Sequence, residues 1–181
     1  MPSGRRGQRS RVITSGIIVA LILVALAFYL SSPRDFLQLE NNETHVPLFW
    51  LGVEGDEAFS LAFKHSYDKA MYIEHYRIGG GGTILFTGIS FRSDLNGQGF
   101  IFPDADYRLS KGWGEFKGAH KVMKSIRFIM GSPDQANHTL LIHNKSYFLT
   151  RYVKPGTPVA FRFLKRSRFF TCIWRVEKWM N

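Results

Sequence analysis

The chain has 181 residues, of which 45% are hydrophobic and 21% charged, and its formal net charge is +10. This length suits one domain of ordinary size with a short appendage, and the composition excludes a disordered chain and a multi-span membrane protein. A single cysteine, Cys172, excludes an internal disulfide and a zinc site built on several cysteines.

The first 32 residues have the pattern of a membrane-targeting segment. Four arginines occur in residues 1–11, no acidic residue precedes Asp35, and residues 12–32 carry no charge. About 20 apolar residues, rising about 1.5 Å each, cross a hydrocarbon core of roughly 30 Å. We therefore expect a single-pass signal anchor over residues 12–32. The arginines predict a cytoplasmic tail at residues 1–11 and a periplasmic or extracellular body, held at the inner or plasma membrane.

A cleaved signal peptide is the alternative for this segment, with Ala-Leu-Ala at residues 25–27 as the cleavage signal. The apolar run continues through residues 28–30, where a signal peptide would turn polar, and this favours an uncleaved anchor. Either alternative exports the rest of the chain. Outside residues 1–11 the net charge is about +6, which favours an acidic partner surface or an anionic solute.

The exported part has the pattern of an all-β domain. Residues 33–47 are polar, and we expect them to form a tether with little structure of its own. From residue 48 to residue 164, runs with alternating apolar and polar side chains are separated by turn signals such as the glycines at 79–82. We expect a small antiparallel sandwich or barrel of about seven strands, preceded by one N-terminal transmembrane helix. The expected strands are residues 58–65, 71–78, 83–91, 122–130, 138–143, 146–152 and 159–163.

Two segments do not follow this alternation. Residues 92–118 are rich in Gly, Asp and Asn, and we expect a long loop with room for one short strand. The basic, aromatic tail at residues 165–181 fits two structures. One is an amphipathic helix lying on anionic lipid or docked on a membrane partner. The other is a last β-strand with Cys172 turned inward.

Templates for catalysis are missing from the sequence. It contains no Gly-x-Ser-x-Gly elbow, no phosphate loop, no dinucleotide fingerprint and no His-Glu-x-x-His motif. We therefore predict no catalytic residue, no cofactor and no metal. The alternatives are a hydrolase that uses Ser66 with His138, a metal held by His65, Glu74 and His138, and a structural envelope protein. We expect no nucleic-acid partner, because the expected compartment holds little nucleic acid.

Several short motifs carry a resemblance to a known family. The segment FKHSYDKAMYIEHYRI at residues 63–78 resembles the opening motif, His-Ser followed by Glu-x-Tyr or Glu-x-Phe, of the bacterial domain of unknown function 1850. Residues 91–93 resemble its Phe-x-Ser segment, residues 137–140 its His-Thr-Leu motif and residues 155–157 its Pro-Gly-Thr turn. The resemblance covers residues 59–163. The chain departs from the family in its first motif, where Ala70 and His75 replace the usual Pro and second Glu.

The resemblance implies an exported protein without an assigned activity. Family members are often encoded beside tripartite TRAP-type transporters of the TAXI class. We therefore expect a membrane-anchored extracytoplasmic binding or accessory module whose partner is the membrane subunit or the solute-binding protein of such a transporter. The residues expected to contact a ligand or partner are His65, Ser66, Glu74, Tyr76, Phe91, Ser93 and His138.

Overall fold

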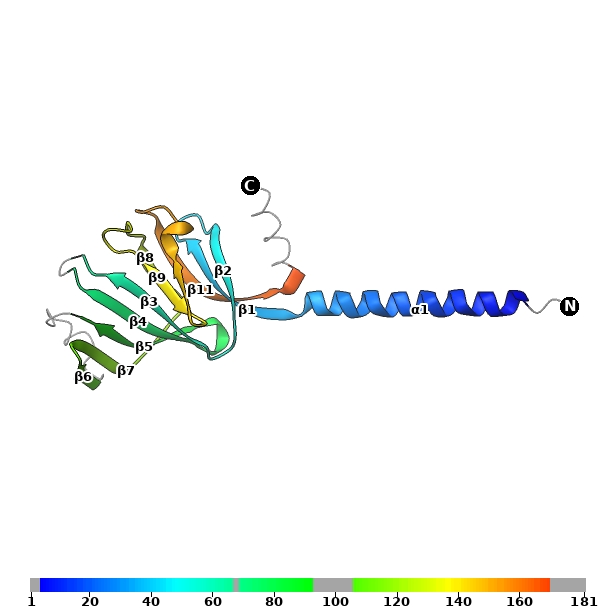
Figure 1. Cartoon of the computed structure of the whole chain (residues 1–181), viewed down its shortest axis with the longest axis horizontal. Helices are drawn as coiled ribbons and strands as arrows, with labels where there is room; N and C mark the ends of the chain where they lie inside the picture. Colours follow the sequence, from blue (N-terminus) through cyan, green and yellow to red (C-terminus); the bar gives the residue numbers. More distant parts are fainter. Residues whose placement is uncertain (1–3, 67–68, 93–105, 170–181) are drawn as a thin grey trace. The chain divides into compact units, whose positions relative to one another are not determined.

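The structure is a computed structural model that describes residues 4–66, 69–92 and 106–169, with side chains described from residue 15. Figure 1 shows the elements along the chain. They are α1 (Gly4–Ser31), β1 (Pro33–Asn41), β2 (Pro47–Val53), β3 (Ala58–Lys64), β4 (Met71–Ile78), the 3-10 turn η1 (Gly80–Gly82), β5 (Ile84–Phe91), β6 (Asp106–Ser110), β7 (Trp113–Met123), β8 (Ile126–Ile129), β9 (Thr139–Ile142), β10 (Lys145–Phe148), η3 (Leu149–Arg151) and β11 (Pro158–Ser167).

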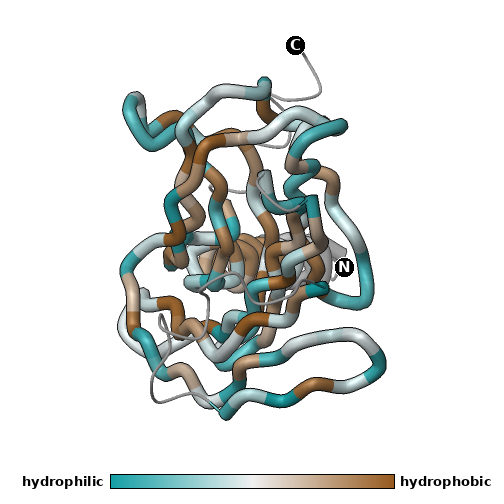
Figure 2. Tube along the Cα trace, turned by 90° about the vertical axis from the view of Figure 1, so that its left-hand side faces the viewer, coloured by the Kyte–Doolittle hydropathy of each residue, from teal (hydrophilic) through white to brown (hydrophobic). Residues whose placement is uncertain are grey.

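The strands form two antiparallel sheets. The smaller sheet has the order β2-β1-β11-β8, and the larger one has the order β10-β9-β3-β4-β5-β7-β6. In the chain trace, hydrophilic segments gather at the outer turns and hydrophobic segments lie mainly between them (Figure 2). The prediction of an all-β domain is confirmed.

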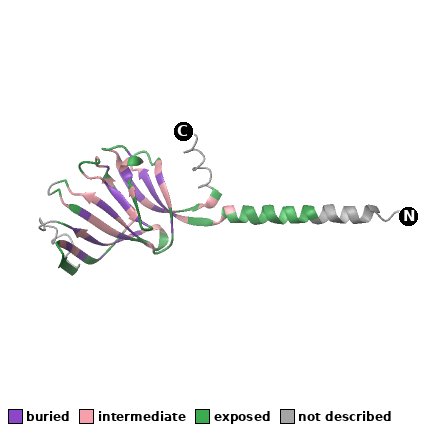
Figure 3. Cartoon of the chain, viewed as in Figure 1, coloured by how far each residue is buried: buried purple, intermediate pink, exposed green. Residues whose placement is uncertain are grey.

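The core is built from alternate residues of the strands, as the period of two requires. In β4, Tyr72 and Tyr76 are buried while Arg77 is exposed. In β11, Val159, Phe161 and Phe163 are buried on one face, and Ala160 between them is buried as well. Figure 3 shows this concentration of buried residues along the strands of both sheets.

The predicted number of strands is too low, and the prediction for residues 92–118 is wrong where the structure describes them. Residues 106–110 form β6, and β7 runs over eleven residues from Trp113 to Met123. Strand β7 lies between β5 and β6, so backbone pairing on both sides stabilises it despite its glycines and lysines. The expected strand at residues 122–130 is also divided between the end of β7 and the short strand β8.

The predicted tether is likewise wrong. Residues 33–41 form β1, which pairs with β2 in register Leu37↔Leu51, and Leu37 and Leu39 are fully buried. The body begins at Asp35 instead of residue 48: the chain divides into two compact units, Met1–Arg34 with Arg166–Asn181, and Asp35–Lys165. Burial of Leu37 and Leu39 supplies the hydrophobic stabilisation that a polar tether lacks.

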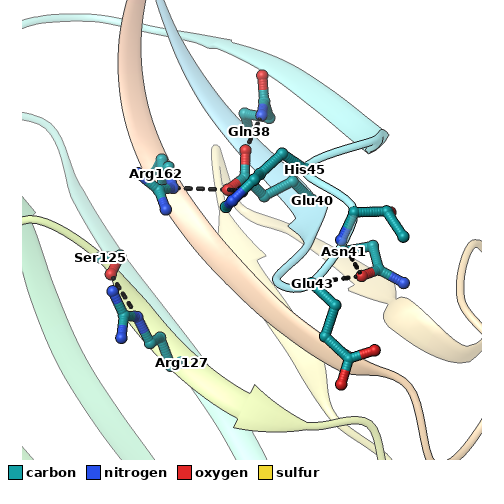
Figure 4. Close-up of polar contacts among 9 residues, drawn as sticks. Gln38, Glu40, Asn41, Glu43, His45, Ser125, Arg127 and Arg162 are labelled. Carbon is teal, nitrogen blue, oxygen red and sulfur yellow. Dashed lines mark hydrogen bonds and ion pairs between the residues drawn. The ribbon is translucent and has the colours of Figure 1, made fainter.

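Gln38 and Glu40 give β1 a polar sequence, yet both are buried, and their side chains contact each other (Figure 4). The side-chain amide of Gln38 donates to Glu40 Oε2 at 2.5 Å. The other carboxylate oxygen of Glu40 lies 2.6 Å from Nε of Arg162 on β11 and 3.2 Å from Nδ1 of His45. A carboxylate buried in this way is tolerated because hydrogen bonds and an opposite charge replace its water.

The predicted helix at the N-terminus is present as α1, and its described side chains are mainly exposed (Figure 3). Among the residues that the structure describes, no helix meets the length and apolar character required to span a membrane. The crossing of a membrane by residues 12–32 stays a prediction. The two alternatives for the C-terminal tail concern mostly residues 170–181, which lie outside the described residues; the part before them continues β11 to Ser167.

Candidate ligand-binding site

A cavity of about 490 Å³ opens where β3 ends, beside the loop that follows β8. Three parts of the chain that are distant in sequence meet there: the end of β3, the loop between β8 and β9, and the turn before β11. The cavity is lined by Phe63, Lys64, His65, Ser66, Ile129, Met130, Gly131, Ser132, Gln135, Ala136, His138, Pro155 and Gly156. Three of the predicted contact residues, His65, Ser66 and His138, therefore lie at one cavity.

His65 and Ser66 begin the turn between β3 and β4. The main-chain N–H of His65 donates to the carbonyl of Ala70 at 2.8 Å, and the N–H of Lys69 donates to the carbonyl of His65 at 3.1 Å. The imidazole ring of His65 lies 4.9 Å from the ring of Tyr72. Backbone bonds and ring packing thus hold His65 at the cavity wall, while Ser66 is exposed beside it.

His138 lies just before β9 and is 92% buried, with an exposed fraction of 8%. Its ring centroid is 5.6 Å from that of Phe63 and 4.6 Å from that of Phe128. This apolar burial lowers the pKa of His138 from 6.5 to about 4, because the charged imidazolium loses its hydration there. His138 is therefore neutral at physiological pH.

A backbone hydrogen bond selects the tautomer of this neutral ring. The main-chain N–H of Gly131 donates to Nδ1 of His138 at 3.2 Å. Nδ1 must then be the acceptor nitrogen, so the proton resides on Nε2. His138 therefore lines the cavity as a neutral ring with its proton on Nε2.

The loop that carries Gly131 is held on both sides. The N–H of Lys64 at the end of β3 donates to the carbonyl of Ala136 at 2.8 Å. The carbonyl of Ser132 accepts the N–H groups of Gln135, Ala136 and Asn137 at 3.0 to 3.2 Å. These bonds satisfy backbone groups of the loop that forms part of the cavity wall.

The described lining contains no carboxylate. The exposed Asp134 is outside the lining but interacts with it: its pKa is lowered chiefly by a hydrogen bond from Ser132, with a smaller contribution from the charge of Lys64. Lys64 supplies the cationic group of the lining. Together with Nε2–H of His138, the site presents donors and positive charge.

Glu74 and Tyr76 do not line this cavity. They lie on one face of β4, where the Tyr76 hydroxyl donates to Oε2 of Glu74 at 2.6 Å. Glu74 stands in register between the buried side chains of Leu61 and Ile89. Burial raises the pKa of Glu74, and the hydrogen bond from Tyr76 offsets part of this rise. Burial beside the Glu74 carboxylate raises the pKa of the Tyr76 hydroxyl in turn.

Phe91 belongs to the core and Ser93 lies outside the described residues. Phe91 is fully buried, with its ring 5.5 Å from that of Tyr72 and 5.8 Å from that of Phe116. The prediction that Phe91 contacts a ligand or partner receives no support from this position. Phe91 instead continues a row of rings that crosses the larger sheet from Phe63 through Tyr72, with centroids 6.0 Å apart, to Phe116.

The metal alternative requires several ligating side chains close together. Within residues 4–66, 69–92 and 106–169, no group of three or more His, Cys, Asp or Glu side chains is placed to hold a metal ion. His65 and His138 share the cavity, but Glu74 is committed to Tyr76 on β4.

The family of the chain follows from a comparison with protein-family models. The model of the domain of unknown function (DUF1850) matches residues 59–149, which is half of the chain. The chain belongs to the DUF1850 family. In this DUF1850 member the matched residues run from β3 to the first residue of η3 and contain almost all of the larger sheet, with His65, Ser66 and His138. The Pro155-Gly156 turn lies beyond them. No curated protein and no solved structure matches the chain.

A second polar cluster, which the sequence does not reveal, lies on the other face of β4. Nδ1 of His75 lies 2.9 Å from the Ser60 hydroxyl on β3, and Nε2 lies 2.7 Å from the Ser90 hydroxyl on β5. Burial lowers the pKa of His75; the charge of Glu115 opposes this shift and the charge of Lys117 adds to it. Alternation along β4 puts His75 on the face opposite Glu74, but its partners depend on the register of three strands.

Proposed function

We propose that this DUF1850 member is a membrane-anchored extracytoplasmic binding or accessory module that works with a tripartite TRAP-type transporter of the TAXI class. Its ligand site in this proposal is the cavity lined by His65, Ser66 and His138. The observation that carries the proposal is their convergence. The His-Ser motif after β3 and the His-Thr-Leu motif at the start of β9 are more than 60 residues apart, yet each contributes a histidine to this cavity. Concave sites with a few polar groups among apolar ones are typical of ligand binding.

The membrane anchor rests on the N-terminal segment. Residues 12–32 are uncharged, four arginines precede them, and apolar side chains of α1 such as Leu23, Val24 and Phe28 are exposed. Exposed apolar surface of this extent on one helix is stabilised by contact with lipid. A reporter fused after Asn181 tests the orientation: activity outside the cytoplasm supports the proposal, and activity confined to the cytosol contradicts it.

The proposed association with a transporter rests on the genes that often lie beside those of family members, and it needs a direct test. The full chain with a C-terminal affinity tag is recovered from native membranes in mild detergent. As a control, residues 1–32 are replaced by an unrelated single-span anchor, so that the same body is held at the same membrane. Recovery of transporter subunits with both proteins supports association through the body. Recovery of no subunit with either protein contradicts it.

Hydrolysis is the second candidate, because Ser66 and His138 line the same cavity. A general base must offer an acceptor nitrogen to the nucleophile. In His138 that nitrogen is Nδ1, which already accepts the Gly131 N–H, and the remaining Nε2 carries the proton. This argues for binding over base catalysis. Labelling of the protein by a fluorophosphonate probe, lost in Ser66→Ala, would reverse the preference.

A further inference from the structure

We propose that the cavity binds a small organic carboxylate with an apolar body, whose carboxylate accepts the Nε2–H of His138 and pairs with Lys64. This inference rests on the proposed binding function and specifies the ligand of that same site. It is carried by the chemistry of the lining, which combines hydrogen-bond donors, one cation and a larger apolar surface.

The hydrogen-bond donors of the cavity lining favour a carboxylate ligand. Because the Gly131 N–H occupies Nδ1, the cavity-lining ring of His138 carries its proton on Nε2, and this ring packs against Phe63 and Phe128. The hydroxyl of Ser66 and the amide of Gln135 supply further donor groups. A carboxylate is an acceptor-only group with several lone pairs, so it is the common ligand group that suits a cluster of donors best.

The charge of the cavity lining also favours a carboxylate ligand. Lys64 lines the cavity, and no described lining residue is acidic. Asp134 stands outside the lining, is exposed, and is engaged by Ser132. An anionic ligand is therefore attracted by Lys64 and meets no carboxylate in the lining, whereas an amine would be repelled by Lys64.

The rest of the lining sets the body of the ligand. Phe63, Met130 and Pro155 contribute apolar surface, and the exposed side chain of Ile129 stands at the rim with 67% of its surface accessible. A volume of about 490 Å³ accommodates a small molecule rather than a polymer. Apolar carbon buried here adds affinity to the contacts made by the carboxylate.

The test is a titration of the full chain in detergent micelles by calorimetry, with matched probes that share one carbon skeleton. Benzoate, benzamide and benzylamine form the aromatic set, and hexanoate, hexanamide and hexylamine form the aliphatic set. We expect the carboxylate of at least one set to bind about tenfold more tightly than its amide and its amine, as the loss of one charge-assisted hydrogen bond predicts. The same preference should disappear in His138→Phe and weaken in Lys64→Glu.

Two surface variants control for indirect effects. His120→Phe and Lys121→Glu make the same chemical changes at exposed positions of β7 and should bind the carboxylate as the wild type does.

Should His138→Phe fold poorly, His138→Gln, which keeps an N–H donor, should retain more of the carboxylate preference than His138→Leu. If an amide or amine binds best and His138→Phe abolishes it, the carboxylate proposal is overturned while the binding function stands. If no probe of any class binds, both are overturned.

Discussion

The main-chain N–H of Gly131 donates a hydrogen bond of 3.2 Å to Nδ1 of His138, and this contact sets the chemical character of the cavity. It leaves His138 with a proton on Nε2, so the residue acts as a donor. The low pKa of the buried ring keeps it in this neutral state. A histidine that the sequence presents as a candidate base is thereby suited to hold a ligand.

The first prediction concerns the pH dependence of stability. The pKa of His138 is about 4 in the folded protein and near its ordinary value of 6.5 in the unfolded chain. The unfolded state therefore binds more protons at acid pH, so the contribution of His138 is fully present above pH 6.5 and is lost as the pH falls toward 4. The loss should reach about 3 kcal/mol.

Urea denaturation of the wild type and of His138→Gln at pH 7 and pH 4.5 measures this contribution. His65, Lys64 and Asp134 are the titratable groups around the ring, and both proteins contain them. The difference between the two proteins in the loss of unfolding free energy from pH 7 to pH 4.5 therefore isolates His138. Equal losses in wild type and variant would contradict the neutral, buried ring.

The second prediction concerns the backbone at Gly131. A Cβ at this position would collide with the Cβ of Ala136, so the loop must shift and the N–H moves away from His138. Gly131→Ala should lower the free energy of unfolding by about 1–3 kcal/mol. Gly55→Ala is the matched control, since a Cβ there meets no atom within 4 Å, and it should change stability by less than about 0.5 kcal/mol. Chemical denaturation curves of both variants decide the question.

The third prediction concerns Glu74. Its folded pKa lies above the ordinary value of 4.5, so ionisation costs more in the folded protein than in the unfolded chain. The wild type should lose stability as the pH rises from 4.5 through the folded pKa. Glu74→Gln removes this loss and keeps an acceptor for the Tyr76 hydroxyl, so the variant should gain stability relative to the wild type as the pH rises. Thermal unfolding between pH 4 and pH 8, with exposed Glu43→Gln as control, provides the measurement.

The fourth prediction concerns the contacts of His75. A neutral imidazole has one donor and one acceptor, so one of Ser60 and Ser90 donates to the ring and the other accepts from it. Ser60→Ala and Ser90→Ala should each cost about 0.5–1.5 kcal/mol. Because both act through one ring, the double variant should differ from the sum of the single ones. Strict additivity in denaturation experiments would argue against a connected cluster.

The sequence predicts the strands that alternate cleanly and misses those whose partners are distant. The expected strands at 58–65, 71–78 and 83–91 agree with β3, β4 and β5 to within one residue at each end. Strand β1 escapes prediction because Gln38 and Glu40 look solvent-exposed, whereas Arg162, over 120 residues later, makes their burial possible.

The same distinction holds for the candidate site. The family-like motifs of the sequence are enough to select His65, Ser66 and His138. The donor role of His138 depends on the N–H of Gly131, which reaches Nδ1 only in the folded loop. Glu74 and Tyr76 belong to one sequence motif and contact each other, yet they do not line the cavity. Alternation assigns a residue to a face of its strand and does not determine which distant loops lie beside it.

The central claim, that His138 is a neutral Nε2–H donor to a ligand, is tested most directly by nitrogen-15 NMR of histidine-labelled protein. At pH 7 the ring of His138, assigned by comparison with His138→Gln, should show the Nε2–H tautomer, and its Nε2 resonance should move when benzoate or hexanoate is added. A ring that is charged at pH 7, or one that carries its proton on Nδ1, would contradict the account.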